Sequence, residues 1–151
     1  MPPTLSDIQQ ARERIKPYAH RTPVLTNESL NQQVDAPVYL KCENLQKVGA
    51  FKFRGACNAV YSLTDEEAAH GVVTHSSGNH AQALALAAKM RGIPAYIVMP
   101  SNAPQVKRMR SLATADRSHF ASRLSRREKA QWRGSGKRQA RPLFIRMTMK
   151  K

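Results

Sequence analysis

Residues 44–56 read NLQKVGAFKFRGA, and Lys52 is the side chain in this stretch that is best placed for chemistry. It follows a turn containing Gly49 and opens a predicted helix over 53–63, so its amine should lie among apolar neighbours near backbone N–H groups. Desolvation and the positive end of the helix dipole both disfavour the charged ammonium. The stretch therefore predicts an amine suited to nucleophilic or Schiff-base chemistry. The alternative is that Lys52 extends from the helix start into solvent.

A second stretch, residues 75–82, reads HSSGNHAQ and follows a short apolar run. A helix rich in Ala and Leu is predicted from Asn79 to about Met90, so the small polar residues precede a helix N-terminus, where anions bind well. The alternative for Ser76 and Ser77 is ordinary capping of that helix, which contributes roughly 1 kcal/mol. For His80 the alternative is a solvated first helical turn.

Helical and strand patterns alternate through the first part of the chain. Apolar residues at helical spacing predict a first helix that Ser6 caps and Pro17 ends. Short apolar runs predict strands at 38–40, 72–74 and 95–99. Alternation of this kind predicts an α/β fold, with a parallel sheet covered by helices and ligands bound at the carboxyl ends of the strands. Both polar stretches lie in such loops.

Charge divides the chain into two parts. Residues 1–108 hold 12 Lys or Arg against 8 Asp or Glu, a net of +4, whereas residues 109–151 hold 13 against 2, a net of +11. The formal charge of +15 therefore describes mainly the second part. Charge confined to one segment gives no indication of a specific nucleic-acid partner for the fold.

Several other classes of protein are not indicated. No apolar run approaches the roughly 18 residues of a membrane span, and the N-terminus does not resemble a signal peptide. We therefore expect a cytoplasmic protein without a membrane partner. Cys42 and Cys57 form no CxxC motif and are expected to be reduced, and the five histidines show no metal-ligand spacing, so no metal site is predicted.

Four motifs, in order along the chain, resemble those of one enzyme family. The chain is identified as similar to the pyridoxal-phosphate-dependent serine racemase and threonine dehydratase family, which has the tryptophan synthase β-like fold called fold type II. The motifs are RTPVLT at 21–26, FKFRGA at 51–56, SSGNH at 76–80 and GIPAYIVMP at 92–100. The resemblance implies a partial parallel-sheet domain of that fold. It also implies serine racemisation, or dehydration of serine or threonine, on a small amino-acid substrate.

The resemblance further implies roles for residues around the cofactor. Lys52 would form the Schiff base with pyridoxal 5'-phosphate and move the substrate α-proton on one face. Phe51 would pack against the pyridine ring, and Asn79 would hydrogen-bond its phenolic oxygen.

On the substrate side, the resemblance makes Ser77 the second acid/base, on the opposite face of the α-carbon. The substrate carboxylate would be held at the helix N-terminus by the loop residues, namely Ser76, Ser77, Gly78, Asn79 and His80. This assignment is chemically coherent, because racemisation needs one proton donor on each face of a planar carbanion.

Some full-length relatives also bind ATP with Mg²⁺, near the counterparts of Asn27, Lys47 and Gln82. Only Lys47 and Gln82 match in residue type here, so this implication is the weaker one. Full-length relatives are expected to be homodimers.

The resemblance ends near Arg108, and residues 109–151 are predicted to be a disordered basic tail outside the family pattern. A shift of the tail's codons by two bases can encode AVAGYG, CEPTLA and TGATVIHPYDDE, three strings that look like the missing family continuation. We therefore interpret the chain as a truncated family member with a frame-shifted tail, weakly active or inactive by itself. The alternative is a non-catalytic fragment whose basic tail binds polyanions.

Overall fold

The computed structural model describes residues 2–99, 105–106, 118–122 and 143–144 of the chain. Within these residues no helix is both long enough and apolar enough to cross a membrane.

A parallel four-stranded sheet forms the centre of the fold, in the order β5-β4-β3-β6. The strands are β3 (Val72–His75), β4 (Ala95–Met99), β5 (Ser118–Ser122) and β6 (Leu143–Phe144). β3 and β4 run in parallel with Val72 opposite Ala95. The sequence prediction of an α/β fold with a parallel sheet is thus confirmed.

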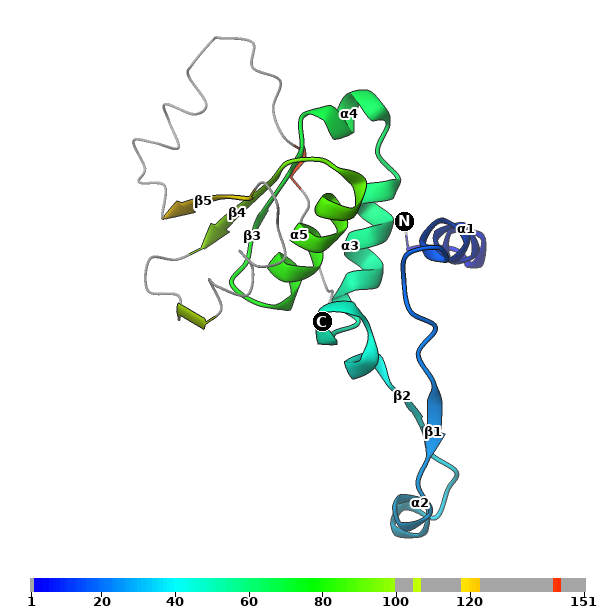
Figure 1. Ribbon diagram of the computed structural model, residues 1–151. Helices are drawn as coiled ribbons and strands as arrows, with labels where there is room; N and C mark the ends of the chain where they lie inside the picture. The colour runs from blue at the N-terminus through cyan, green and yellow to red at the C-terminus, as the bar shows by residue number, and fades with distance from the viewer. Residues whose placement is uncertain (1, 100–104, 107–117, 123–142, 145–151) are drawn as a thin grey trace.

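Two helices, α3 (Lys52–Tyr61) and α5 (Asn79–Arg91), build the core with this sheet (Figure 1). α5 packs against α3 on one side and against β3 and β4 on the other. The α3 positions that point inward are apolar at helical spacing, and Phe53 and Val60 are fully buried there against Leu84 of α5. Small alanines along α5 let the elements approach closely, because Ala81, Ala83, Ala85, Ala87 and Ala88 are all fully buried.

The N-terminal helix α1 (Leu5–Ile15) begins two residues earlier than the predicted Ser6 cap implied. Thr4, not Ser6, is the N-cap, and it forms a capping box in which its hydroxyl accepts from the Asp7 N–H while the Asp7 carboxylate accepts from the Thr4 N–H. The reciprocal bonds satisfy two donors at once. Arg14 of α1 donates to the Asn58 side chain of α3 at 2.5 Å.

An arm extends from this core in Figure 1. It consists of two strands that pair antiparallel with each other, β1 (Val24–Thr26) and β2 (Tyr39–Lys41), and of the short helix α2 (Glu28–Val34), which connects them at the far end of the arm. Two single 3₁₀ turns, η1 (Glu43–Leu45) and η2 (Lys47–Gly49), then lead into α3. The remaining helix, α4 (Asp65–Ala69), follows α3.

Part of the basic segment after residue 108 joins the sheet. β5 pairs in parallel with β4, and β6 pairs in parallel with β3. The expectation of a segment without regular structure is therefore not met at residues 118–122 and 143–144. The physical reason is that the free edges of β3 and β4 offer backbone donors and acceptors whatever the side chains of the added strand are. The rest of 109–151 lies outside the described residues.

Gly71, which precedes β3, gives a direct test of this packing. Its φ is +75°, and a Cβ placed on it would lie 2.5 Å from the Pro94 carbonyl oxygen. Gly92 has nearly the same φ, +74°, but a Cβ there meets no described atom within 4 Å. We expect Gly92→Ala to destabilise the fold by about 1 kcal/mol, from backbone conformation alone. Gly71→Ala should destabilise it by roughly 1–3 kcal/mol more, because it adds a clash. Urea midpoints will measure both, and equal losses would contradict the close approach of Gly71 to Pro94.

Candidate active site

The turn after β3 carries the predicted carboxylate-binding residues. The Ser76 N–H donates to the Val98 carbonyl of β4 at 3.1 Å, so the turn is anchored to the sheet. The Ser76 Oγ accepts a 3.2 Å hydrogen bond from the Gly78 N–H. Ser77 is half-buried, and Asn79 and His80 are the first two residues of α5, exposed and half-buried respectively.

The N-terminus of α5 is open rather than capped by a side chain. Gly78 is its N-cap residue, and no described side chain makes a capping hydrogen bond there. The alternative that Ser76 or Ser77 caps α5 is therefore wrong, because Ser76 bonds within the turn instead. A Cβ built on Gly78 meets no described atom within 4 Å, so the space beside this N-cap residue is free of described atoms.

Lys52 is the first residue of α3, and Phe51 before it is the N-cap. Lys52 is half-buried, and its Nζ lies over the Phe51 ring, 4.9 Å from the ring centroid. Phe51 is 48% exposed. The amine is thus neither enclosed among apolar side chains nor extended fully into solvent, since it stands beside an accessible aromatic face.

The two predicted stretches meet at one end of the helix pair. Figure 1 shows the first turns of α3 and α5 at the same end, where β3 finishes. The η2 turn of the lysine segment also contacts α5. The serine turn follows the parallel strand β3, as the sequence predicted. The lysine segment instead follows β2, which pairs antiparallel with β1 outside the parallel sheet, so the prediction that both stretches follow strands of one parallel sheet is wrong for the lysine segment.

The backbone before Lys52 has an unusual conformation. Val48 has φ 57° and Gly49 has φ 66°, both in the left-handed region. Gly49 adopts this conformation without strain, but the branched Val48 does not. Val48 is held there by packing on the core cluster of α3 and α5. Such strain is retained only where the surroundings fix the loop.

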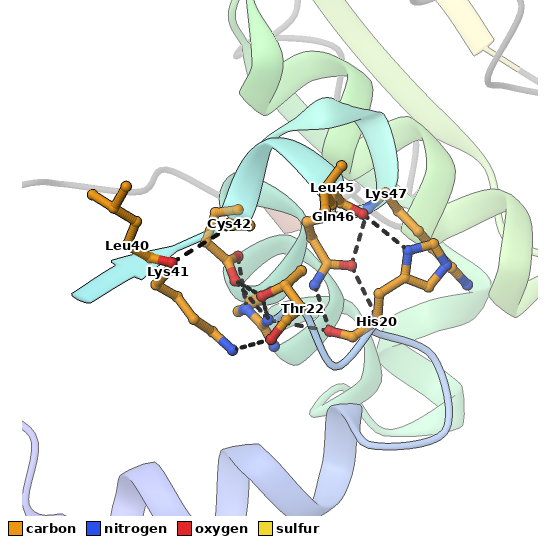
Figure 2. A network of polar contacts seen from close by, with 10 residues as sticks. His20, Thr22, Leu40, Lys41, Cys42, Leu45, Gln46 and Lys47 are labelled. Atoms are coloured by element: carbon orange, nitrogen blue, oxygen red, sulfur yellow. Dashed lines mark hydrogen bonds and ion pairs between the residues drawn. The ribbon is translucent and has the colours of Figure 1, made fainter. Parts of the chain in front are cut away.

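A network of polar contacts, absent from our sequence predictions, surrounds this loop (Figure 2). Arg54 of α3 binds Glu43 of η1 with two hydrogen bonds, Nε to Oε2 at 2.8 Å and Nη2 to Oε1 at 2.7 Å. The Thr22 hydroxyl donates to the same Glu43 Oε1 at 2.7 Å. Only the fold reveals this pairing, since Thr22 and Arg54 are far apart in sequence. The sign of it in the sequence is that an acidic residue, Glu43, precedes Lys52 and a basic residue, Arg54, follows it.

Arg54 holds the pKa of Glu43 down, to about 2, chiefly through its hydrogen bond to that carboxylate. Because this pKa is lower than the unfolded value, Glu43 stabilises the fold fully above about pH 5, and its contribution disappears as the pH falls towards 2. We expect the stability difference between the wild type and Glu43→Gln to be about 2 kcal/mol at pH 7 and to vanish near pH 2. Urea unfolding at a series of pH values will test this. A difference that stays constant with pH would show that the Glu43 charge does not matter.

The buried thiol in this region is not a candidate nucleophile. Burial raises the pKa of Cys57 to about 11, which keeps it protonated.

Comparison with known proteins agrees with this geometry. The family model described as "Pyridoxal-phosphate dependent enzyme" matches residues 15–136. Serine racemase of Arabidopsis thaliana is 69% identical over 100 residues, covering 66% of this chain and 30% of that protein. L-threo-3-hydroxyaspartate ammonia-lyase of Saccharomyces cerevisiae is 56% identical over 105 residues, covering 70% of this chain and 32% of that protein.

Among solved structures, that of serine racemase from Dictyostelium discoideum superposes with a TM-score of 0.82 and 43% identity. The match covers 94% of this chain and 46% of that one. The chain spans about a third of the length of the curated relatives that it matches.

Proposed function

This chain belongs to the pyridoxal-phosphate dependent enzyme family, and we propose that its described part is one half of an active site for small hydroxy amino acids, serine and threonine. The observation that carries the proposal is the position of Lys52 at the same end of the helix pair as the open N-terminus of α5. The proposed reactions are serine racemisation and dehydration of serine or threonine. They are proposed for a protein that joins this part to the remaining length of its relatives.

The residues present fit pyridoxal phosphate. Lys52 offers a partly exposed amine, and the exposed Phe51 ring beside it offers an aromatic face for a planar pyridine. Asn79, at the start of α5, is exposed and offers an amide for the phenolic oxygen. We assign the covalent attachment of the cofactor to Lys52, its ring contact to Phe51 and its phenolic oxygen to Asn79.

Bound pyridoxal phosphate supplies an electron sink that stabilises negative charge on the α-carbon of an amino acid. The chain's own part is to move the α-proton. Lys52 takes or returns it on one face, and Ser77 does the same on the opposite face. Dehydration of the L-substrate needs one of these groups at the α-carbon, whereas racemisation needs both.

The carboxylate of the substrate is assigned to the turn at 76–80. The first N–H groups of α5 point out of the helix start and carry its positive dipole end, so they favour an anion. Ser76 shapes the turn through its bond to Gly78. His80, in the first turn of α5, is the last of the residues that we assign to the substrate carboxylate.

For the longer protein, the proposal includes two further features that the resemblance supports. One is a homodimer. The other is a nucleotide with a divalent cation near Lys47, whose Nζ lies 5.6 Å from the Phe53 ring centroid.

The test is turnover by a chain whose reading frame is restored after Arg108. Supplied with pyridoxal phosphate, the restored chain should form D-serine from L-serine, and it should form the corresponding keto acid and ammonia from L-serine or L-threonine. The 151-residue chain, which covers about a third of its relatives, should give little of either. Absence of both products from the restored chain would reject the proposed function.

A further inference from the structure

We infer that Arg54 and Glu43 are positioning residues for Lys52, which hold the lysine loop, residues 42–51, against the first turn of α3. The inference rests on the proposed function, in which Lys52 carries the cofactor. It adds the residues that keep the amine in place, none of which touches the reacting atoms in this assignment.

The Arg54–Glu43 pair joins the beginning of the lysine loop to α3, which follows its end. Arg54 lies two residues after Lys52 and Glu43 lies nine residues before it, and the paired side chains are 32% and 20% exposed. Both oxygens of the carboxylate are engaged, one by Nε and the other by Nη2. A two-point contact of this kind fixes orientation as well as distance, which a single charge contact does not.

The same pair also ties in the chain segment 20–22. Arg54 Nη2 donates to the His20 carbonyl at 3.1 Å and to the Thr22 hydroxyl at 3.3 Å. Lys41 Nζ donates to the Thr22 carbonyl at 2.7 Å. Three parts of the chain therefore meet on one arginine: the segment before β1, the lysine loop and α3.

Gln46 fixes the middle of the lysine loop. It is only 3% exposed, and its amide oxygen accepts from the N–H groups of His20 at 2.9 Å and Lys47 at 3.0 Å. Its amide nitrogen donates to the His20 carbonyl at 2.8 Å. Figure 2 shows this side chain between His20 and Lys47. A buried amide satisfied on both sides strongly specifies one arrangement.

Lys52 depends on this support because the backbone leading to it is strained. Val48, four residues before Lys52, has a left-handed φ of 57°. If Val48 relaxed to an ordinary negative φ, the backbone from Gly49 to Lys52 would run in another direction. After Val48 the Gly49 N–H donates to the Gln46 carbonyl at 2.8 Å, and the N–H groups of Phe53 and Arg54 then donate to the Ala50 and Phe51 carbonyls in the first turn of α3. The contacts at Arg54 and Gln46 thus maintain the strained loop and the direction of the Lys52 side chain.

Arg91 provides a matched control in the same molecule. It lies in the last turn of α5 and donates to the carbonyls of Val60 and Leu63 and to the Asp65 carboxylate, at the opposite end of the helix pair. Like Arg54, it joins several chain segments through one guanidinium. Arg91→Lys therefore removes a comparable set of bonds without touching the lysine loop.

The experiment uses the full 151-residue chain. The protein is incubated with pyridoxal phosphate, reduced with borohydride and digested, and the label at Lys52 is divided by the label at the exposed Lys16 of the same molecule. We expect Arg54→Lys and Glu43→Gln each to lower this ratio about tenfold, the size of one lost charged hydrogen bond. In the double variant the ratio should fall no further than in either single variant, because both substitutions break the same Arg54–Glu43 pair. Arg91→Lys should leave the ratio within about twofold.

Backbone hydrogen exchange of the peptide over residues 43–54, without cofactor, provides an independent measurement. It should accelerate in Arg54→Lys and Glu43→Gln and not in Arg91→Lys. If Lys52 of the wild type is never labelled, the proposed function fails, and the exchange data still decide whether the pair holds the loop. An unchanged labelling ratio, an equal fall in Arg91→Lys, or unchanged exchange at 43–54 would each overturn the positioning role.

Discussion

Replacing Lys52 with alanine is expected to abolish the visible absorbance of the cofactor adduct at Lys52, leaving only the adducts of exposed amines such as Lys16, and to lower turnover of the frame-restored chain at least about a thousandfold. The reason is that this one amine has two roles in the proposed site, covalent attachment and proton transfer. Spectrophotometric titration with pyridoxal phosphate measures the first, and product formation from L-serine measures the second.

Lys16→Ala is the matched control for Lys52→Ala. Lys16 follows α1, where its side chain is 69% exposed and bonded only weakly to Glu13, at 3.4 Å. Its removal should take away only the absorbance of its own adduct and should leave the turnover unchanged. If the adduct persists undiminished in Lys52→Ala, other amines account for it, and the site assignment is wrong.

Ser77→Ala is expected to separate the two reactions. Racemisation should fall by about a hundredfold or more, because inversion needs a proton donor on the second face. Dehydration of L-serine should stay within about tenfold, since Lys52 can take the α-proton unaided. Chiral analysis of serine and measurement of the keto acid from the same reaction give the two rates.

Ser76→Ala provides the comparison for Ser77→Ala. Ser76 bonds the Gly78 N–H and so shapes the turn, which means that its loss should weaken both reactions together. Equal losses of racemisation and dehydration in Ser77→Ala would instead give Ser77 the same supporting role as Ser76.

The central elements were predictable because their signals are local. β3 and β4 are short apolar runs, and α5 is an alanine-rich segment that ends where Gly92 adopts a left-handed φ of +74°. The position of the serine loop follows from the order of these elements, because it lies at the carboxyl end of the parallel strand β3. The position of the lysine loop does not, because it follows β2, which pairs antiparallel with β1 outside the parallel sheet.

What the sequence could not predict depends on contacts between distant residues. The pairing of Glu43 with Arg54 and the fully bonded Gln46 appear only after the 20–22 segment folds against α3. The cap of α1 was misplaced because Thr4 and Ser6 are both good caps, and each has a residue three positions later, Asp7 or Gln9, that can return the hydrogen bond. β5 was missed because pairing along a free strand edge does not need an apolar period.

Lys52 and the N-terminus of α5 are proposed to belong to one site, and amide NMR of the chain provides a direct test. Pyridoxal phosphate is attached and reduced with borohydride, and the ¹⁵N–¹H spectrum is compared with that of the unmodified protein. We predict that the amides of Gly78, Asn79 and His80 shift in the wild type and stay unchanged in Lys52→Ala treated in the same way. Shifts confined to residues around Lys52, with the α5 amides unaffected, would contradict the claim.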